Sequence, residues 1–164
     1  MSAQKTIAIV GATGNPGNEI ACQFAFTGYR LLLISNDISK LIQLKEGITC
    51  KEPKAEIDAI ECVKDGCWEA DIIILAVAVH EEKEVAEMMK EVATQKIVVD
   101  VSNEEKAGEY LQQILPYSKL VMVSGNLSAK EMVISGEDGE VNEEIAEIFN
   151  QAGYYSTIVQ SIHH

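Results

Sequence analysis

The chain has 164 residues, of which 26 are acidic and 13 basic, so its net charge is −13 and its pI is about 4.6. Apolar residues make up 47% of the sequence and prolines number only three, a composition typical of one domain with a sizeable core. We therefore expect a single domain over residues 1–164, with no separate substrate domain. A surface this acidic repels phosphate backbones and anionic lipids, which argues against nucleic-acid and membrane partners.

The sequence also limits where the protein is expected to work. Its longest apolar stretch, Ile72–Val79, is too short to span a bilayer, and the first residues lack the basic-then-apolar pattern of a signal peptide. Both features favour a cytoplasmic protein. The four cysteines are irregularly spaced without a Cys-x-x-Cys pair, so we expect ordinary thiols and no metal site.

Short apolar runs rich in β-branched residues recur along the chain, and several are continuous, as in strands covered on both faces. These runs are Ile7–Val10, Leu31–Ile34, Ile72–Val77, Ile97–Val101, Leu120–Val123, Met132–Ile134 and Ser156–Val159. Between many of them lie segments with apolar residues at helical spacing. These segments are Asn18–Thr27, His80–Ala93, Glu104–Leu115 and Val141–Gln151. The alternation predicts an α/β fold of the Rossmann type, a doubly wound, mostly parallel sheet with helices on both faces.

Two segments depart from strict alternation. The connection between Val123 and Met132 is shorter than a parallel crossover of about a dozen residues, so it predicts a hairpin and a mixed sheet edge near the C-terminus. The stretch Glu46–Ala70 has the weakest pattern. There we expect a short edge strand over Ile57–Glu61 and a turn at Asp65-Gly66.

A glycine-rich loop directly follows the first predicted strand, with the sequence Gly11-Ala12-Thr13-Gly14-Asn15-Pro16-Gly17. Gly11 and Gly14 would allow a tight turn and the close approach of a pyrophosphate, and Gly17 would let the helix pack on the strand. We expect Asn15 to be the N-cap and Pro16 the first helical residue. A plain structural turn is the alternative, but the flanking strand and helix favour a dinucleotide site with the pyrophosphate at the helix start.

The end of the second predicted strand bears on the choice of cofactor. An acidic residue there would bind the ribose hydroxyls of NAD, whereas a small polar residue with a nearby cation suits the 2′-phosphate of NADP. Ser35 and Asn36, followed by Lys40, favour NADP, while Asp37 keeps NAD open. Asp37 or Ser39 would alternatively cap the next helix.

Further candidates for cofactor contact lie at the ends of later strands. Ala76 and Val77 are small enough to let a nicotinamide ribose lie across the carboxyl edge of the sheet. His80 follows in the loop, where it is either a cofactor contact or the start of a surface helix. Asn126 offers both a donor and an acceptor near the hydride-transfer partner.

Three segments of the chain resemble the NADPH-dependent reductases of coenzyme F420 and their bacterial relatives. They are Ile7–Gly17, Gly66–Val77, which includes Trp68, and Glu91–Asp100. The resemblance spans most of the chain, and the last two segments are more particular than the first. In that family a nicotinamide and a deazaflavin stack and exchange hydride directly. The resemblance therefore implies that no catalytic acid or base is required from the protein.

The resemblance also implies particular cofactor contacts. It assigns the pyrophosphate to Thr13, Gly14, Asn15 and Pro16, the adenosine ribose to Ser35 and Asn36, and the nicotinamide half to Ala76 and Val77. The chain departs from the family at Asn36, where members typically carry arginine. It departs again over Met122–Asn126, where members have Lys-Ala-Phe-Asn-Thr beside the nicotinamide.

These patterns predict an NADP-binding oxidoreductase that transfers hydride between NADP(H) and a deazaflavin, flavin or similar small redox acceptor. A non-catalytic dinucleotide-binding or sensor module derived from such a reductase is the second interpretation. An atypical short-chain dehydrogenase ranks last, because the Tyr-x-x-x-Lys pair of that class does not occur in the sequence. We also expect a homodimer, because the last strand would leave an open sheet edge.

Overall fold

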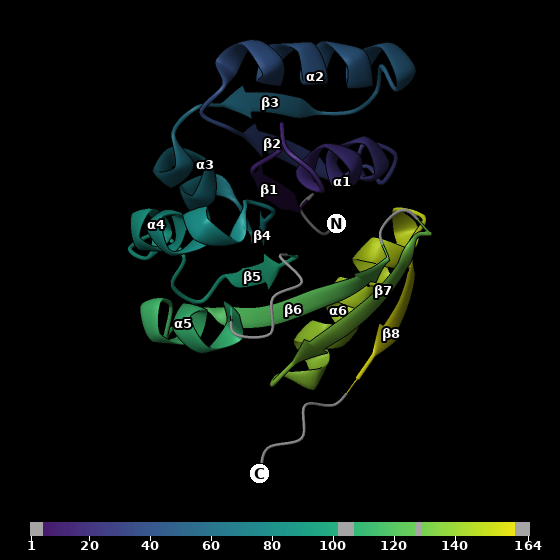
Figure 1. The fold of residues 1–164 in the computed structure, drawn as a ribbon. Coiled ribbons are helices and arrows are strands. Elements are labelled where there is room, and N and C mark those ends of the chain that lie inside the picture. Colours follow the sequence, from purple (N-terminus) through teal and green to yellow (C-terminus); the bar gives the residue numbers. More distant parts are fainter. Residues whose placement is uncertain (1–4, 102–106, 127–128, 160–164) are drawn as a thin grey trace.

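The computed structural model describes residues 5–101, 107–126 and 129–159 (Figure 1). Eight strands form one sheet in the order β3-β2-β1-β4-β5-β6-β7-β8. The strands are β1 (Thr6–Val10), β2 (Arg30–Ile34), β3 (Ile57–Ile60), β4 (Ile72–Leu75), β5 (Ile97–Asp100), β6 (Lys119–Asn126), β7 (Glu131–Gly136) and β8 (Tyr155–Ile158). Strands β1 to β6 are parallel. This order confirms the predicted Rossmann-type sheet.

Helices cover both faces of the sheet, as the alternating pattern predicts. They are α1 (Gly17–Phe24), α2 (Ile38–Lys51), α3 (Val63–Glu69), α4 (Val79–Met89), α5 (Ala107–Ile114) and α6 (Gly139–Gln151). Helices α1, α2 and α6 bury side chains on one face, and α3, α4 and α5 on the other. Within the described residues, no helix is long and apolar enough to cross a membrane.

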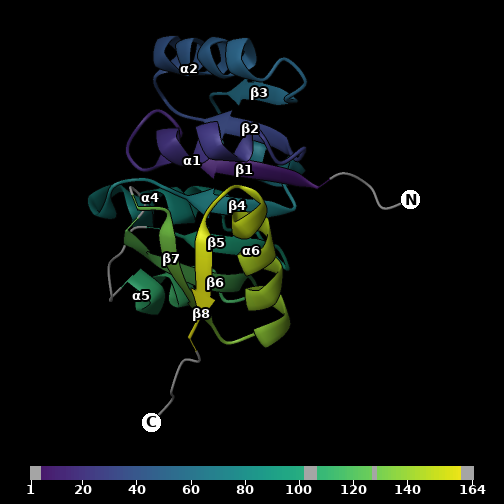
Figure 2. The same ribbon diagram turned by 90° about the vertical axis from the view of Figure 1, so that its right-hand side faces the viewer.

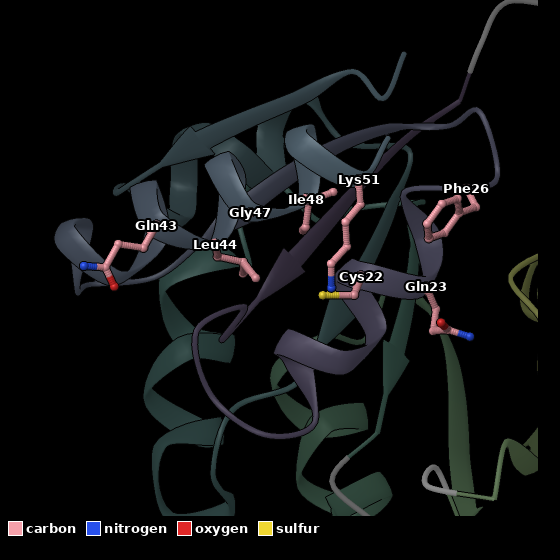
Figure 3. Close-up of a pocket in the computed structure, with 8 residues that line it drawn as sticks. All are labelled: Cys22, Gln23, Phe26, Gln43, Leu44, Gly47, Ile48 and Lys51. Atoms are coloured by element: carbon pink, nitrogen blue, oxygen red, sulfur yellow. The ribbon is translucent and has the colours of Figure 1, made fainter. Parts of the chain in front are cut away.

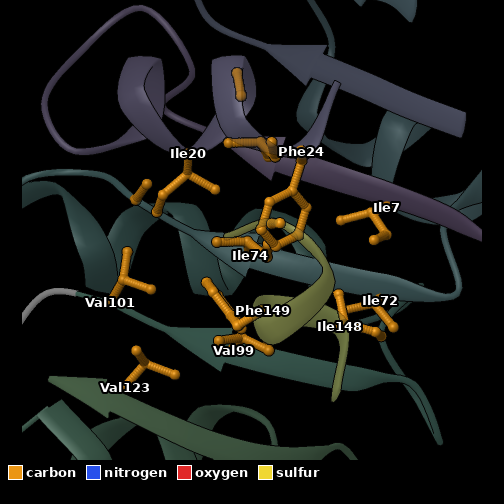
Figure 4. Packing of buried hydrophobic residues seen from close by; sticks show 14 of the residues in the cluster. Ile7, Ile20, Phe24, Ile72, Ile74, Val99, Val101, Val123, Ile148 and Phe149 are labelled. Atoms are coloured by element: carbon orange, nitrogen blue, oxygen red, sulfur yellow. The ribbon is translucent and has the colours of Figure 1, made fainter. Parts of the chain in front are cut away.

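The central strands are buried on both faces, which explains their continuous apolar runs. In β1, Ile7 and Ile9 point into one core, and Ala8 and Val10 point into the other. Figure 4 shows the first core, in which aromatic side chains from distant helices meet. The rings of Phe24 and Phe149 lie 5.1 Å apart in an edge-to-face arrangement. Burying each such ring stabilises the fold by about 1.5–3 kcal/mol, so this contact anchors α6 against α1.

The C-terminal side of the sheet is mixed, as predicted. Strand β7 pairs antiparallel with β6, with Val123 opposite Ile134, and β8 pairs parallel with β7 at the edge. Figure 2 shows β8 at this near edge with α6 beside it. At the opposite edge, β3 confirms the short edge strand expected near Ile57.

Two expectations need correction or adjustment. The turn expected at Asp65-Gly66 is wrong, because both residues lie inside α3. A Cβ atom on Gly66 would lie 2.4 Å from Ile34 Cδ1, so glycine here lets the helix approach β2 closely. The helix expected over Glu104–Leu115 is observed as α5, and residues 102–106 lie outside the described part of the chain.

Candidate functional site

The loop between β1 and α1 lies against the ends of two other strands. The Gly11 amide donates to the Ile34 carbonyl at the end of β2, at 2.9 Å. Gly11 has a φ of +88°, and a Cβ atom there would lie 2.6 Å from the carbonyl oxygen of Ala76, which follows β4. Only glycine fits this position without strain. The loop is thereby held between the ends of β2 and β4, beside the point where the strand order reverses, which lies between β1 and β4.

The other two glycines of the loop have different surroundings. A Cβ atom on Gly17 would lie 2.2 Å from the Gly11 carbonyl oxygen, so Gly17 lets α1 pack tightly on the loop, whereas the prediction was close packing on the strand itself. The same atom on Gly14 would meet only the Gly11 oxygen, at an ordinary 3.6 Å. Gly14 therefore faces open space, which is the room that a pyrophosphate approaching the backbone needs.

The expected start of α1 is wrong by one residue. Pro16, rather than Asn15, is the N-cap, and the helix begins at Gly17. The Pro16 carbonyl accepts from the Ile20 amide at 3.0 Å, as an N-cap carbonyl does, while the Asn18 amide donates to the Gly14 carbonyl at 2.8 Å within the loop turn. Pro16 offers no side-chain oxygen to the first helical amides. The helix start thus remains suited to binding an anion from outside.

The end of β2 is joined to the glycine-rich loop by side chains. The hydroxyls of Ser35 and Thr13 are hydrogen-bonded at 2.7 Å, and Ser35 Oγ also accepts from the Asp37 amide at 3.1 Å. Asp37 Oδ1 in turn accepts from the Lys40 amide at 3.1 Å, which makes Asp37 the N-cap of α2. The capping interpretation of Asp37 is therefore confirmed. The exposed Lys40 ammonium lies 4.0 Å from Asp37 Oδ2.

These elements surround a cavity of about 560 Å³, which we call the strand-edge cavity because it lies at the carboxyl ends of β1, β2 and β4. Its lining residues are Val10, Gly11, Thr13, Gly14, Asn15, Ile34, Ser35, Asn36, Val63, Ala76, Val77, Ala78, Glu81, Glu84, Val85 and Met88. Most of the residues predicted to contact the cofactor are thus brought together. Both the volume and the position are those of ligand sites in doubly wound folds.

Five predicted contact residues are not among those that line the strand-edge cavity: Pro16, Gly17, Lys40, His80 and Asn126. Pro16 and Gly17 shape the loop behind it. The side chain of His80 is 82% exposed, with Nε2 3.6 Å from Glu81 Oε1. The side-chain oxygen of Asn126 accepts from the Ala129 amide at 3.1 Å, within the β6–β7 hairpin.

Sequence reasoning missed the part of the cavity formed by helix α4. Glu81, Glu84, Val85 and Met88 occupy one face of this helix at helical spacing and line the cavity, together with Val63 at the start of α3. The spacing was visible in the sequence, but it is the same as that of an ordinary surface helix. Among the described residues that line the cavity, the charged ones are Glu81 and Glu84.

A second cavity, of about 460 Å³, lies between α1 and α2 (Figure 3). It is lined by Cys22, Gln23, Phe26, Gln43, Leu44, Gly47, Ile48 and Lys51. None of the predicted cofactor contacts is in this set. It contains neither the glycine-rich loop nor a strand end, so the strand-edge cavity is the candidate functional site.

Groups with perturbed ionisation lie elsewhere in the molecule. Burial raises the pKa of the Cys67 thiol to about 12. Lys96 Nζ donates to the carbonyl oxygens of Cys67 and Trp68 at 2.6 and 2.5 Å, and burial lowers the pKa of this ammonium. Because Lys96 directly precedes β5, this cluster is at the amino edge of the sheet, opposite the strand-edge cavity. It binds the end of α3 to the sheet.

A known protein family matches the part of the chain that forms the strand-edge cavity. A model of the family described as NADP oxidoreductase coenzyme F420-dependent matches residues 6–104. The chain belongs to this family. The match covers β1 to β5 and the helices between them, and so includes every residue that lines the strand-edge cavity. No curated protein sequence matches the chain.

Solved structures show the same fold at low sequence identity. A pyrroline-5-carboxylate reductase from Coxiella burnetii is 19% identical, with a TM-score of 0.77 over 98% of this chain and 60% of its own. A diketoreductase is 18% identical, with a TM-score of 0.80 over 99% and 66%. A candidate F420-dependent NADP reductase from Arthrobacter sp. FB24 is 15% identical, with a TM-score of 0.69 over 96% and 85%. The chain therefore spans less than two thirds of the first two proteins. The fold is that of NAD(P)-dependent oxidoreductases.

Proposed function

We propose that this protein binds NADP(H) in the strand-edge cavity and transfers hydride between it and a deazaflavin, a flavin or a similar flat redox acceptor. The observation that carries the proposal is the open position at Gly14. At Gly14 the backbone borders the cavity beside a helix start that has no side-chain cap. Gly11 and Gly17, in contrast, are in close contact with other backbone atoms of the protein. The family to which the chain belongs supports the choice of NADP.

The residues present fit the three parts of a dinucleotide. Gly14 and Asn15, with the first amides of α1, would hold the pyrophosphate. Ser35 and Asn36 would bind the adenosine ribose and its 2′-phosphate, with Lys40 as the nearby cation. Thr13 would hold Ser35 in place through their hydrogen bond.

Ala76 and Val77 would form the floor under the nicotinamide half. Ala76 is 4% exposed and Val77 is half-buried, so together they present a small apolar surface at the end of β4. When bound, the nicotinamide supplies the hydride chemistry itself. The protein would orient the ring and keep water away from its lower face, which are the contributions expected of a protein in direct hydride transfer.

A specific observation also supports the second function, a non-catalytic dinucleotide-binding or sensor module. Among the described residues, those that line the strand-edge cavity all lie between positions 10 and 88. Asn126, the residue expected to reach the hydride partner, is instead bonded within its own hairpin. The nucleotide half of the site is thus more complete than the half for the acceptor.

The two functions are separated by binding and turnover with the same purified protein. NADPH binding is followed by the change in nicotinamide fluorescence. Oxidation is then followed by absorbance, without oxygen, with a deazaflavin, a flavin and a quinone as acceptors. Turnover with one of them supports the oxidoreductase, and binding without turnover supports the sensor module. Absence of NADPH binding would contradict both.

The cofactor preference has its own test. We expect tighter binding of NADPH than of NADH, and Lys40→Ala should reduce this preference because the 2′-phosphate loses its nearby cation. Lys54→Ala removes an exposed ammonium beyond the end of α2 and is the matched control. If NADH binds the unaltered protein at least as tightly, the choice of NADP is wrong.

A further inference from the structure

One part of the strand-edge cavity is bordered by α3 and α4, which lie against each other (Figure 1). Its side chains are Val63 at the start of α3 and Glu84, Val85 and Met88 on one face of α4. The proposed function, on which this inference rests, gives this part a specific ligand group.

The order of the strands decides which group that is. The glycine-rich loop after β1 would hold the pyrophosphate, β4 would hold the nicotinamide half and the end of β2 would hold the adenosine ribose. Val63 follows β3, which lies beyond β2 on the side away from β4. The base attached to the ribose at Ser35 therefore extends toward Val63, and the part of the cavity between α3 and α4 receives the adenine.

The wall of this part suits a flat aromatic base. Val63 and Val85 are half-buried, and Met88 keeps 48% of its surface exposed although it lines the cavity. A flexible thioether packs well against an aromatic face. Covering these apolar surfaces with a base would remove them from water, which is the driving force for binding in such a pocket.

A single carboxylate accompanies these apolar groups. Glu84 precedes Val85 directly and lies one turn before Met88, so it shares their face of α4 and is exposed at the cavity. Glu81 also lines the cavity, but it lies one turn earlier in α4, near Ala78. Its Oε1 atom is 3.6 Å from Nε2 of His80. An ionised carboxylate only accepts hydrogen bonds, and the exocyclic amine of adenine only donates them.

We propose that Glu84 is a specificity-determining residue, which accepts a hydrogen bond from the exocyclic amine of adenine. Hypoxanthine carries a carbonyl oxygen in place of this amine, so it presents an acceptor instead of a donor to the carboxylate at that position. A hydrogen bond to a charged group at a partly exposed site is worth about 1.4 kcal/mol, so we expect the hypoxanthine analogue to bind about tenfold more weakly.

The test compares NADPH with its deaminated analogue, in which hypoxanthine replaces adenine. Dissociation constants are measured by nicotinamide fluorescence, and their ratio is the readout. Both nucleotides carry the same phosphates, so the ratio is insensitive to the charge that a variant removes. Glu84→Ala should bring the ratio close to one, and Glu84→Gln, whose amide oxygen still accepts, should retain part of it.

Glu87→Ala is the matched control, because Glu87 is exposed on the same helix, forms an ion pair with Lys90 and does not line the cavity. Its ratio should equal that of the unaltered protein. Equal binding of the two nucleotides by the unaltered protein would overturn the role of Glu84, as would an unchanged ratio in Glu84→Ala. Failure of both nucleotides to bind would overturn the proposed function as well, so the two failures are distinguishable.

Discussion

Gly14 differs from Gly11 and Gly17 because the space beside it is part of the strand-edge cavity and is not filled by protein atoms. We predict that Gly14→Val abolishes NADPH binding, because the added side chain would fill the room for the pyrophosphate. Stability should change little, since the nearest protein atom to the new Cβ is 3.6 Å away. Calorimetric titration measures the first effect and urea unfolding the second.

Gly17 provides the contrast to this experiment. Gly17→Ala places a Cβ atom 2.2 Å from the Gly11 carbonyl oxygen, so the backbone must move. We expect a loss of about 1–3 kcal/mol in the free energy of unfolding.

Unchanged NADPH affinity in a folded Gly14→Val protein would show that the nucleotide binds elsewhere.

Cys67 gives the stability of the protein a dependence on alkaline pH. The thiol is fully buried and its pKa is about 12, whereas an unfolded chain releases this proton near about pH 8.5. Between these values the unfolded state binds fewer protons than the folded state. The free energy of unfolding therefore falls as pH rises, by at most about 1.4 kcal/mol per pH unit from this group.

We predict that Cys67→Ala makes stability less steeply dependent on pH above about pH 8.5, even if its stability at neutral pH is lower. Urea unfolding at a series of pH values gives the slope. Cys50→Ala, which removes an exposed thiol, is the matched control. A slope for Cys67→Ala equal to that of the unaltered protein would contradict the prediction.

Among the elements, α2 depends on a side chain that was also a candidate ribose ligand. Asp37 caps this helix of 14 residues by accepting from the Lys40 amide. Asp37→Ala should lower the free energy of unfolding by about 1 kcal/mol, and Asp37→Asn by only a few tenths, because asparagine caps equally well. Urea unfolding of both variants checks the order. Equal stability of the alanine variant and the unaltered protein would show that the cap contributes nothing.

The elements that sequence patterns predicted well are those whose surroundings are uniform along their length. β1 and β4 are covered on both faces, so a continuous apolar run is sufficient to identify them. Helix α3 gave no such signal, because only Gly66 and Cys67 of its seven residues are buried. Its glycine suggested a turn, whereas close packing against Ile34 is the reason for it.

The candidate site likewise contains some residues that sequence patterns predict and others that they do not. The convergence of Gly14, Ser35 and Ala76 was predictable, because parallel strands end at one edge of a sheet. The contribution of Glu84 and Met88 was not, because it depends on how α4 crosses that edge. His80 instead lies in the first turn of α4 and Asn126 is the last residue of β6, and the side chains of both have other partners.

At the scale of the whole molecule, the net charge opposes self-association and the open edge of the sheet favours it. The net charge of −13 makes two copies repel each other. Among the strands that the structure describes, β8 nevertheless has no neighbour on its outer side, and Tyr155 is 73% and Ile158 39% exposed. A two-fold axis would pair β8 with its own copy in an antiparallel manner and cover this edge on both chains.

We predict a homodimer formed through β8, with twice the chain mass of 17.9 kDa by light scattering at micromolar concentration. Screening weakens the repulsion between copies, so the dimer fraction should rise with salt. The Tyr155 amide donates to the carbonyl of Lys130, just before β7, and the Val159 amide donates to that of Ile134 in β7. Amides alternate in direction along a strand, so the Ile158 amide, directly before Val159, points away from β7. Ile158→Pro removes that outward donor and should give a folded monomer, whereas Ile158→Val should remain dimeric. A monomeric mass for the unaltered protein at every salt concentration would show that the acidic surface prevails over the open edge.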